Sequence, residues 1–120
     1  MPVSIRYIVT DVDDAVDFYV SHLGFEVEMR PGPGFAMLSR GDLRLLLNAP
    51  GAGGAGQAGD PHPGGWNRFQ VATDDLDADV ERLRRTGAHL RTELVEGRGG
   101  RQVVVDDPSG NPVELFQATR

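Results

Sequence analysis

Residues 107–117 read "DPSGNPVELFQ" and combine a tight turn with the start of a strand. The turn residues Asp, Pro, Ser, Gly and Asn come first, and an apolar, strand-like run follows. Glu114 is the carboxylate within that strand, and its neighbours are apolar. A carboxylate in such surroundings is costly unless it is paired, protonated or bound to a metal. The first question about this chain is therefore what Glu114 faces.

Each half of the chain predicts the same order of elements. In both halves an Asp stands where a helix N-cap would, an apolar stripe follows at helical spacing, and a Gly ends the helix. Asp11 and Gly24 bound the first predicted helix, and Asp75 and Gly87 bound the second. The predicted strands are residues 3–10, 25–29, 35–39 and 43–48 in the first half and residues 67–73, 89–94, 102–105 and 112–117 in the second.

The two halves align with each other. Placing Asp11 over Asp75 brings the two helical stripes into register, and the turn "SRGDL" at 39–43 overlays "PSGNP" at 108–112. We infer an internal repeat of about 60 residues. One domain is expected, with module one at 1–48, a crossover at 49–66 and module two at 67–120. The crossover "APGAGGAGQAGDPHPGGW" is too rich in Gly and Pro to pack by itself, so it is either a flexible linker or a mobile lid with Trp66 or His62 reaching inward.

Composition narrows the functional classes. The 120 residues are 39% hydrophobic and 25% charged, as in an ordinary globular domain, and the formal net charge of −6 argues against a nucleic-acid partner. No apolar run approaches the roughly 20 residues that span a bilayer, and the N-terminus has no signal-peptide pattern. The absence of cysteine excludes thiolate chemistry. We expect no membrane partner and a cytoplasmic location.

Four stretches together resemble one known family. They are "DVDDAVDFYVSHLGFEVE" at 11–28, the Gly-rich crossover, "VATDDLDADVERLRRTGA" at 71–88 and "DDPSGNPVELFQ" at 106–117. Their order and spacing resemble the vicinal oxygen chelate superfamily, the glyoxalase/bleomycin-resistance/dioxygenase group. The resemblance implies an α+β fold in which paired β-α-β-β-β modules form a curled, mostly antiparallel eight-stranded sheet around a cleft, with two helices outside. It also implies a homodimer.

The same resemblance supplies a test for a metal. Metalloenzymes of the family hold a divalent ion with His or Glu from four equivalent strand positions, which map here to Ser4, Leu45, Arg68 and Glu114. Glu114 alone matches. Ser is a poor neutral ligand, Leu cannot ligate, and the fixed charge of Arg repels a cation. We therefore expect no metal and no other cofactor, with a divalent metal as the alternative.

The alternation of strand side chains predicts the lining of the cleft. It combines apolar side chains with a few polar groups, which is typical of a small-molecule site. Arg68 and Glu114 would share one floor, and we expect them to form an ion pair in place of the metal. The predicted ligand-binding residues are Ser4, Arg6, Leu45, Leu47, Trp66, Arg68, Gln70, Glu114 and Phe116.

Three functions are compatible with this reading. The first is a small-molecule binder that resembles bleomycin-resistance proteins and sequesters a drug or metabolite without chemistry. The second is a glyoxalase-like lyase or isomerase, or a dioxygenase, in which Glu114 is the catalytic general base, with or without a metal. The third is an interaction module with no small ligand. The missing ligand types and the long crossover favour the first.

Overall fold

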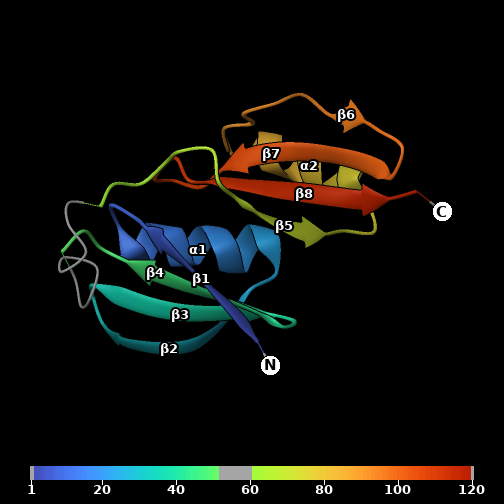
Figure 1. Cartoon of the computed structure of the whole chain (residues 1–120). Coiled ribbons are helices and arrows are strands. Elements are labelled where there is room, and N and C mark those ends of the chain that lie inside the picture. Colours follow the sequence, from blue (N-terminus) through green and yellow to red (C-terminus); the bar gives the residue numbers. More distant parts are fainter. Residues whose placement is uncertain (1, 52–60, 120) are drawn as a thin grey trace. The chain divides into compact units, whose positions relative to one another are not determined.

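The computed structural model describes residues 2–51 and 61–119. The chain forms two compact units, Met1–Pro63 and Gly64–Arg120. Each unit contains one β-α-β-β-β module (Figure 1). The elements of the first unit are β1 (Val3–Ile8), α1 (Val12–Leu23), β2 (Glu26–Gly32), β3 (Phe35–Arg40) and β4 (Leu43–Asn48). Those of the second are β5 (Phe69–Ala72), α2 (Leu76–Arg85), β6 (Val95–Glu96), β7 (Gly100–Asp106) and β8 (Pro112–Ala118).

Each unit has its own four-stranded mixed sheet. The strand orders are β1-β4-β3-β2 and β5-β8-β7-β6. β1 pairs with β4 in parallel, β5 pairs with β8 in parallel, and the other neighbours are antiparallel. The α+β fold of paired modules is therefore confirmed, but as two sheets and not as one eight-stranded sheet. In each module the helix separates the first strand from the hairpins, which lets the last strand return beside the first in the same direction.

Both helices begin at the predicted residues because Asp side chains cap them, whereas α2 has its C-cap at Thr86, one residue before the predicted Gly87. The Asp11 side chain accepts a hydrogen bond from the Asp14 amide at 3.1 Å, and the Asp75 side chain accepts one from the Ala78 amide at 3.0 Å. Gly24 ends α1 in the left-handed region at φ 73°. Neither helix of the described residues is long and apolar enough to cross a membrane.

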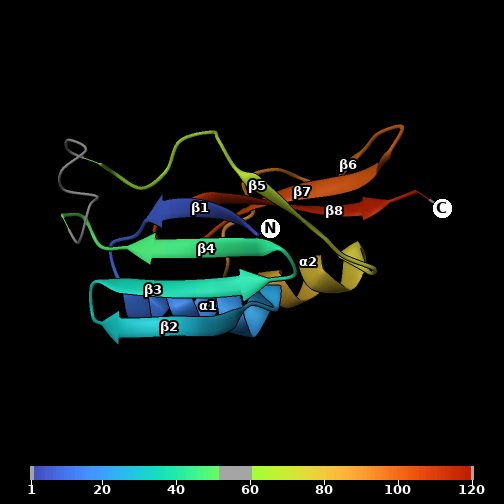
Figure 2. The ribbon, with the colours of Figure 1, turned by 60° about the horizontal axis from the view of Figure 1, so that its bottom comes forward.

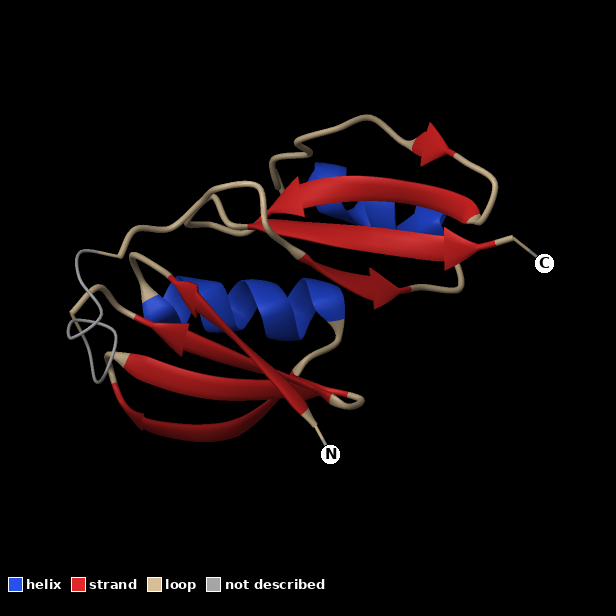
Figure 3. Ribbon diagram, in the orientation of Figure 1, coloured by secondary structure: helices blue, strands red, loops and turns tan. Residues whose placement is uncertain are grey.

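Each helix covers one face of its own sheet, so each unit has one buried and one open side (Figures 2 and 3). Apolar side chains from the helix and from the covered sheet face form the two cores. The fully or nearly fully buried members are Val12, Ala15, Val16, Tyr19, Leu23, Ala36, Leu38, Leu45 and Leu47 in the first unit and Phe69, Val71, Leu76, Val80, Leu83, Val103, Val105, Val113 and Leu115 in the second.

A bidentate ion pair also fastens α2 to its sheet. Arg101 of β7 donates hydrogen bonds to both carboxylate oxygens of Asp77, at 2.8 and 3.1 Å. Hydrogen bonding from the Arg101 guanidinium holds the pKa of Asp77 below its usual value. This contribution to stability is present above the ordinary carboxyl range and is lost as the pH falls through the lowered pKa.

The predicted strand at residues 89–94 is wrong in detail. Within it only Leu90 forms a β-bridge, to Val105, and the strand β6 begins at Val95. The Arg91 and Thr92 amides both donate to the Val104 carbonyl, and the Thr92 hydroxyl accepts from the Val104 amide at 3.0 Å. In residues 89–94, a side-chain hydrogen bond and two amides that share one carbonyl thus replace the regular hydrogen bonds of a β-ladder.

Leu45 and Leu47 lie on the buried face, so the prediction that they line the cleft is wrong. Both are 0% exposed, and their antiparallel partners are the buried Leu38 and Ala36. The error comes from aligning two turns of different length. A two-residue turn joins β3 to β4, whereas five residues join β7 to β8. The resulting offset of one residue exchanges the two faces of a strand, and Leu46 is the residue on the open side.

This assignment predicts different costs for two neighbouring substitutions. Leu45→Ala should lower the free energy of unfolding by about 2–5 kcal/mol, because it leaves a cavity in the core. Leu46→Ala removes the same atoms from a partly exposed side chain and should cost less than half as much. Urea unfolding monitored by circular dichroism measures both. Equal losses, or a larger loss for Leu46→Ala, would contradict the register.

Candidate functional site

The sheet faces opposite the helices carry the candidate site residues, and we call them the first and second open faces. Paired residues of neighbouring strands point to the same side of a sheet. The register of β1, β3 and β4 therefore defines the first open face as Ser4, Arg6, Met37, Ser39, Arg44 and Leu46. The register of β5, β7 and β8 defines the second as Gln70, Gln102, Val104, Glu114 and Phe116, with Arg68 just before β5.

Glu114 faces two donors on the second open face. The Arg68 Nη2 and Nε atoms lie 3.0 and 3.1 Å from Glu114 Oε1, and Gln70 Nε2 donates to Oε2 at 2.5 Å. The Glu114 side chain is only 12% exposed, and that of Arg68 is 30% exposed. The predicted ion pair is confirmed. Both carboxylate oxygens accept hydrogen bonds within the second unit. These bonds offset the desolvation cost of placing a carboxylate among apolar neighbours.

Phe116 follows Glu114 on the same face and depends on a glycine. A Cβ added to Gly100 would lie 2.9 Å from Phe116 Cζ and 2.1 Å from the Gln117 carbonyl oxygen. Any side chain at position 100 would therefore displace the ring or the backbone of β8. The sequence shows this glycine, but nothing in it indicates the close approach.

Trp66 stands at the surface of the second unit and does not reach into a cavity of that unit. Its side chain is 74% exposed, and the guanidinium of Arg91 lies 5.1 Å from its ring centroid. Arg91 also donates to the Gly65 carbonyl at 2.6 Å and pairs with Asp106 at 2.8 Å. Sequence reasoning missed Arg91, because the contact joins residues 25 positions apart.

The end of the crossover is hydrogen-bonded to the turn at residues 107–111. Asp107 and Asn111 are 4% and 3% exposed, and the Asp107 side chain accepts hydrogen bonds from the amides of Ser109 and Asn111 at 2.9 Å. Asn111 Oδ1 in turn accepts from the Gly64 amide at 2.7 Å. Residues 52–60, on which the lid hypothesis depends, lie outside the described residues.

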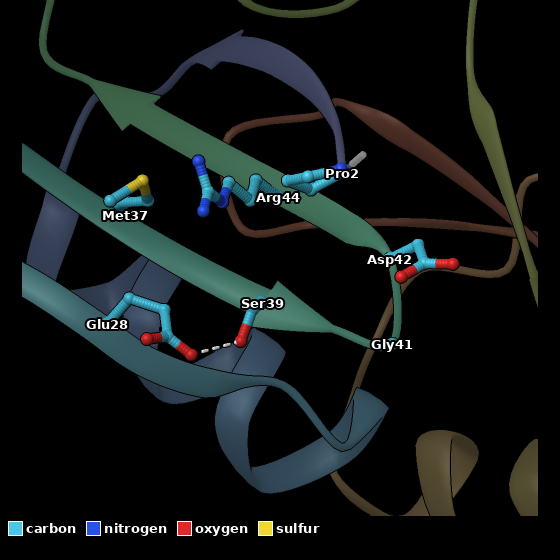
Figure 4. A pocket seen from close by; sticks show the side chains of 7 residues that line it. All are labelled: Pro2, Glu28, Met37, Ser39, Gly41, Asp42 and Arg44. Atoms are coloured by element: carbon cyan, nitrogen blue, oxygen red, sulfur yellow. Dashed lines mark hydrogen bonds between the residues drawn. The ribbon is translucent and has the colours of Figure 1, made fainter.

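A hollow of about 290 Å³ opens on the first open face (Figure 4). Its lining includes Pro2, Glu28, Met37, Ser39, Asp42 and Arg44. The Ser39 hydroxyl donates to the Glu28 carboxylate at 2.5 Å. Ser4 and Arg6 lie on the same face as this lining, because Ser4 pairs with Arg44 and Arg6 with Leu46. Arg44 was missed, since the one-residue offset had placed it on the helix side, and Met37 had not been assigned to either face.

The donor set at the four family metal positions does not suit a divalent ion. Arg6 and Gln70 each stand five residues before a helix cap and pair with Leu46 and Glu114, so Leu46 replaces Leu45 as the counterpart of Glu114. The four positions then hold a hydroxyl, an alkyl group, a guanidinium and one carboxylate. In residues 2–51 and 61–119, no group of three or more His, Asp or Glu residues could hold a metal ion. Tight divalent sites need several such ligands.

Two β-α-β-β-β modules with one open face each define the vicinal oxygen chelate class of folds. Comparison with known families agrees with this architecture. The chain belongs to the Glyoxalase/Bleomycin resistance protein/Dioxygenase superfamily, whose family model matches residues 2–115.

Two solved structures show what related chains do. TnmS3, an antibiotic binding protein from Streptomyces sp. CB03234, is 27% identical, with 99% of this chain and 96% of that chain covered and a TM-score of 0.77. The bleomycin-binding protein of Streptomyces verticillus, complexed with copper(II)-bleomycin, is 26% identical, with 100% and 97% covered and a TM-score of 0.65. Both relatives are ligand-binding proteins by description.

A mycobacterial relative is described as an enzyme and not as a binding protein. The protein described as "Putative glyoxylase CFP32" in Mycobacterium tuberculosis and Mycobacterium bovis is 31% identical over 116 residues. The match covers 92% of this chain but 43% of that protein, so the chain spans less than half the length of the curated relatives it matches.

The ion pair at Glu114 predicts a measurable coupling. Arg68→Gln removes the cation from a mostly buried carboxylate and should lower the free energy of unfolding by about 1–2 kcal/mol. The double variant, Glu114→Gln with Arg68→Gln, should lose clearly less unfolding free energy than the two single variants added together. Each single variant leaves one charge unpaired, and the double variant leaves none. Urea unfolding of the double-mutant cycle tests this, with Arg98→Gln, an exposed arginine, as control. Strict additivity would show that the pair contributes nothing.

Proposed function

We propose that this protein binds a small organic molecule, a drug or a metabolite, without chemical conversion and without a bound metal. The observation that carries the proposal is the state of Glu114. Its two oxygens already accept hydrogen bonds from Arg68 and Gln70. A divalent ion at this position would have to displace a guanidinium, which keeps its charge at any ordinary pH.

The open faces supply the binding surface. The first combines the hollow beside Arg44 with the apolar side chains of Met37 and Leu46. The second carries the Phe116 ring beside polar groups that already have partners. Apolar area with a few oriented polar groups is typical of small-molecule sites. The descriptions of TnmS3 and of the bleomycin-binding protein as ligand binders support the same function.

A glyoxalase-like lyase or isomerase, or a dioxygenase, is the second candidate. The relative described as a glyoxylase favours it. In that function Glu114 would be the general base, and a divalent metal could assist. A base must offer a free oxygen to the proton that it takes. Glu114 would first have to release Arg68 or Gln70, and this requirement favours binding over catalysis.

Metal analysis with thermal unfolding tests the proposal. The purified protein should contain no stoichiometric divalent metal, and EDTA should leave the melting temperature unchanged. Bleomycin or a planar aromatic compound at 100 times its dissociation constant should raise the melting temperature by several degrees, equivalent to about 2.7 kcal/mol of stabilisation. Stoichiometric metal, with turnover of a carbonyl substrate that is lost on chelation, would contradict the proposal.

A matched pair of variants locates the binding surface. Met37→Trp should fill the hollow and weaken ligand stabilisation, because Met37 lines it (Figure 4). Val20→Trp adds a similar bulk to α1 at a side chain that is 39% exposed, and it should leave the stabilisation by ligand unchanged. The opposite order of effects would exclude the first open face as the binding surface.

We also propose that the protein is a cytoplasmic homodimer. Support comes from exposed apolar side chains on the edge strand β2, where Val27 and Met29 are 46% and 48% exposed. Bare strand edges favour association between chains. Sedimentation equilibrium should give twice the chain mass of 13.0 kDa, and the pair Val27→Lys and Met29→Lys should shift it toward the monomer. Val20→Lys on α1 is the control, and a monomeric parent protein would contradict the proposal.

A further inference from the structure

The guanidinium groups of two arginines on the first open face have no partner among the described residues. Arg6 of β1 and Arg44 of β4 are both exposed. In residues 2–51 and 61–119 neither makes an ion pair or a side-chain hydrogen bond. Arg68 on the second open face differs, because its guanidinium forms an ion pair with Glu114. The first open face thus presents guanidinium groups whose donors are available to a ligand.

The position of these two arginines separates them from solvated surface arginines. Arg84, Arg85 and Arg98 also lack a described partner, but they lie in the last turn of α2, where cations are favoured, and in the loop after β6. Arg44 instead lies on a central strand and lines the hollow (Figure 4). Arginines at exposed helix ends and in loops are stabilised by water and by the helix dipole, so their charge does not indicate a ligand.

Arg6 and Arg44 are close enough to act on one group. Ser4 is the pairing partner of Arg44, and Arg6 lies two residues further along β1 on the same face. The spacing of a parallel ladder puts their Cα atoms about 8 Å apart. The guanidinium groups of long side chains on two neighbouring strands repel each other only weakly in water, and an anion bound between them is attracted to both. Each fork can bind a carboxylate through two parallel hydrogen bonds.

The rest of the lining limits the ligand further. Glu28 is bonded to Ser39, and Asp42 lies in the turn between β3 and β4. Glu28 lies on β2, at the opposite edge of the sheet from Arg6 of β1, so its carboxylate places negative charge on the side of the hollow away from Arg6. A ligand with a second anionic group there would be repelled. Met37 and Leu46 supply apolar surface beside Arg44.

We propose that the first open face recognises a small apolar molecule that carries a single carboxylate, which Arg44 binds with Arg6 as the second cation. This inference rests on the proposed small-molecule binding and names the chemical class of the ligand. No reaction step is involved. The acidic net charge of −6 gives anions no long-range attraction, so the preference must come from direct contact with these two side chains.

Two probes of similar shape, one anionic and one neutral, test the inference. Isothermal titration should show 2-naphthoate binding about tenfold more tightly than 2-naphthamide, as for a charge-assisted hydrogen bond on a partly exposed surface. Arg44→Gln should reduce naphthoate affinity to the naphthamide level, Arg6→Gln should reduce it partway, and Arg98→Gln should change neither probe. Circular dichroism checks that each variant is folded.

The outcomes separate this inference from the function beneath it. Equal binding of both probes by the parent protein, or a charge preference that survives Arg44→Gln, would overturn the inference and leave small-molecule binding intact. Binding of naphthalene-2,6-dicarboxylate as tight as that of naphthoate would overturn the limit to one anionic group. Failure of both naphthalene probes, together with bound metal, would overturn the proposed function as well.

Discussion

The structure depends on one constraint, the covering of a four-stranded sheet by a single helix on one face. Side chains alternate across a strand, so the covered face must be apolar and the other face is free of that demand. Leu38 and Leu45 satisfy the first condition in one unit, and Val105 and Val113 satisfy it in the other. Every candidate binding group that the structure retains lies on the uncovered side.

The features that the sequence predicts well are those set by neighbours along the chain. Asp11 and Asp75 cap the helices through bonds spanning three residues, so both helices and the repeat could be read directly. Strand parity depends on long-range pairing and on turn length, and an offset of one residue placed Leu45 on the wrong face. The Arg91 contacts with Trp66 and Asp106 follow from folding and leave no local signal.

The Glu114 pair shows how a polar strand position can be satisfied without a metal. A divalent ion would need several oxygen or nitrogen ligands converging on one point. One guanidinium and one amide satisfy the same carboxylate with two hydrogen bonds and one further ion-pair contact. Because removing either charge alone leaves the other unpaired in a mostly buried place, the pair is more costly to break than its net contribution suggests.

If the protein binds a small molecule as proposed, the two open faces would offer that ligand different amounts of binding free energy, although they are equivalent in the repeat. A ligand anion that approaches Arg68 must compete with Glu114, which already contacts the Nε and Nη2 atoms of the guanidinium. A ligand anion that approaches Arg44 replaces water, and the exchange of water for a charge-assisted hydrogen bond is net favourable. The net free energy of binding is what remains after the cost of removing water from the polar groups. The second open face, whose charged groups are already paired, would therefore contribute mainly shape and apolar contact. In the proposed function, the face whose arginines have no described side-chain partner would contribute the selectivity.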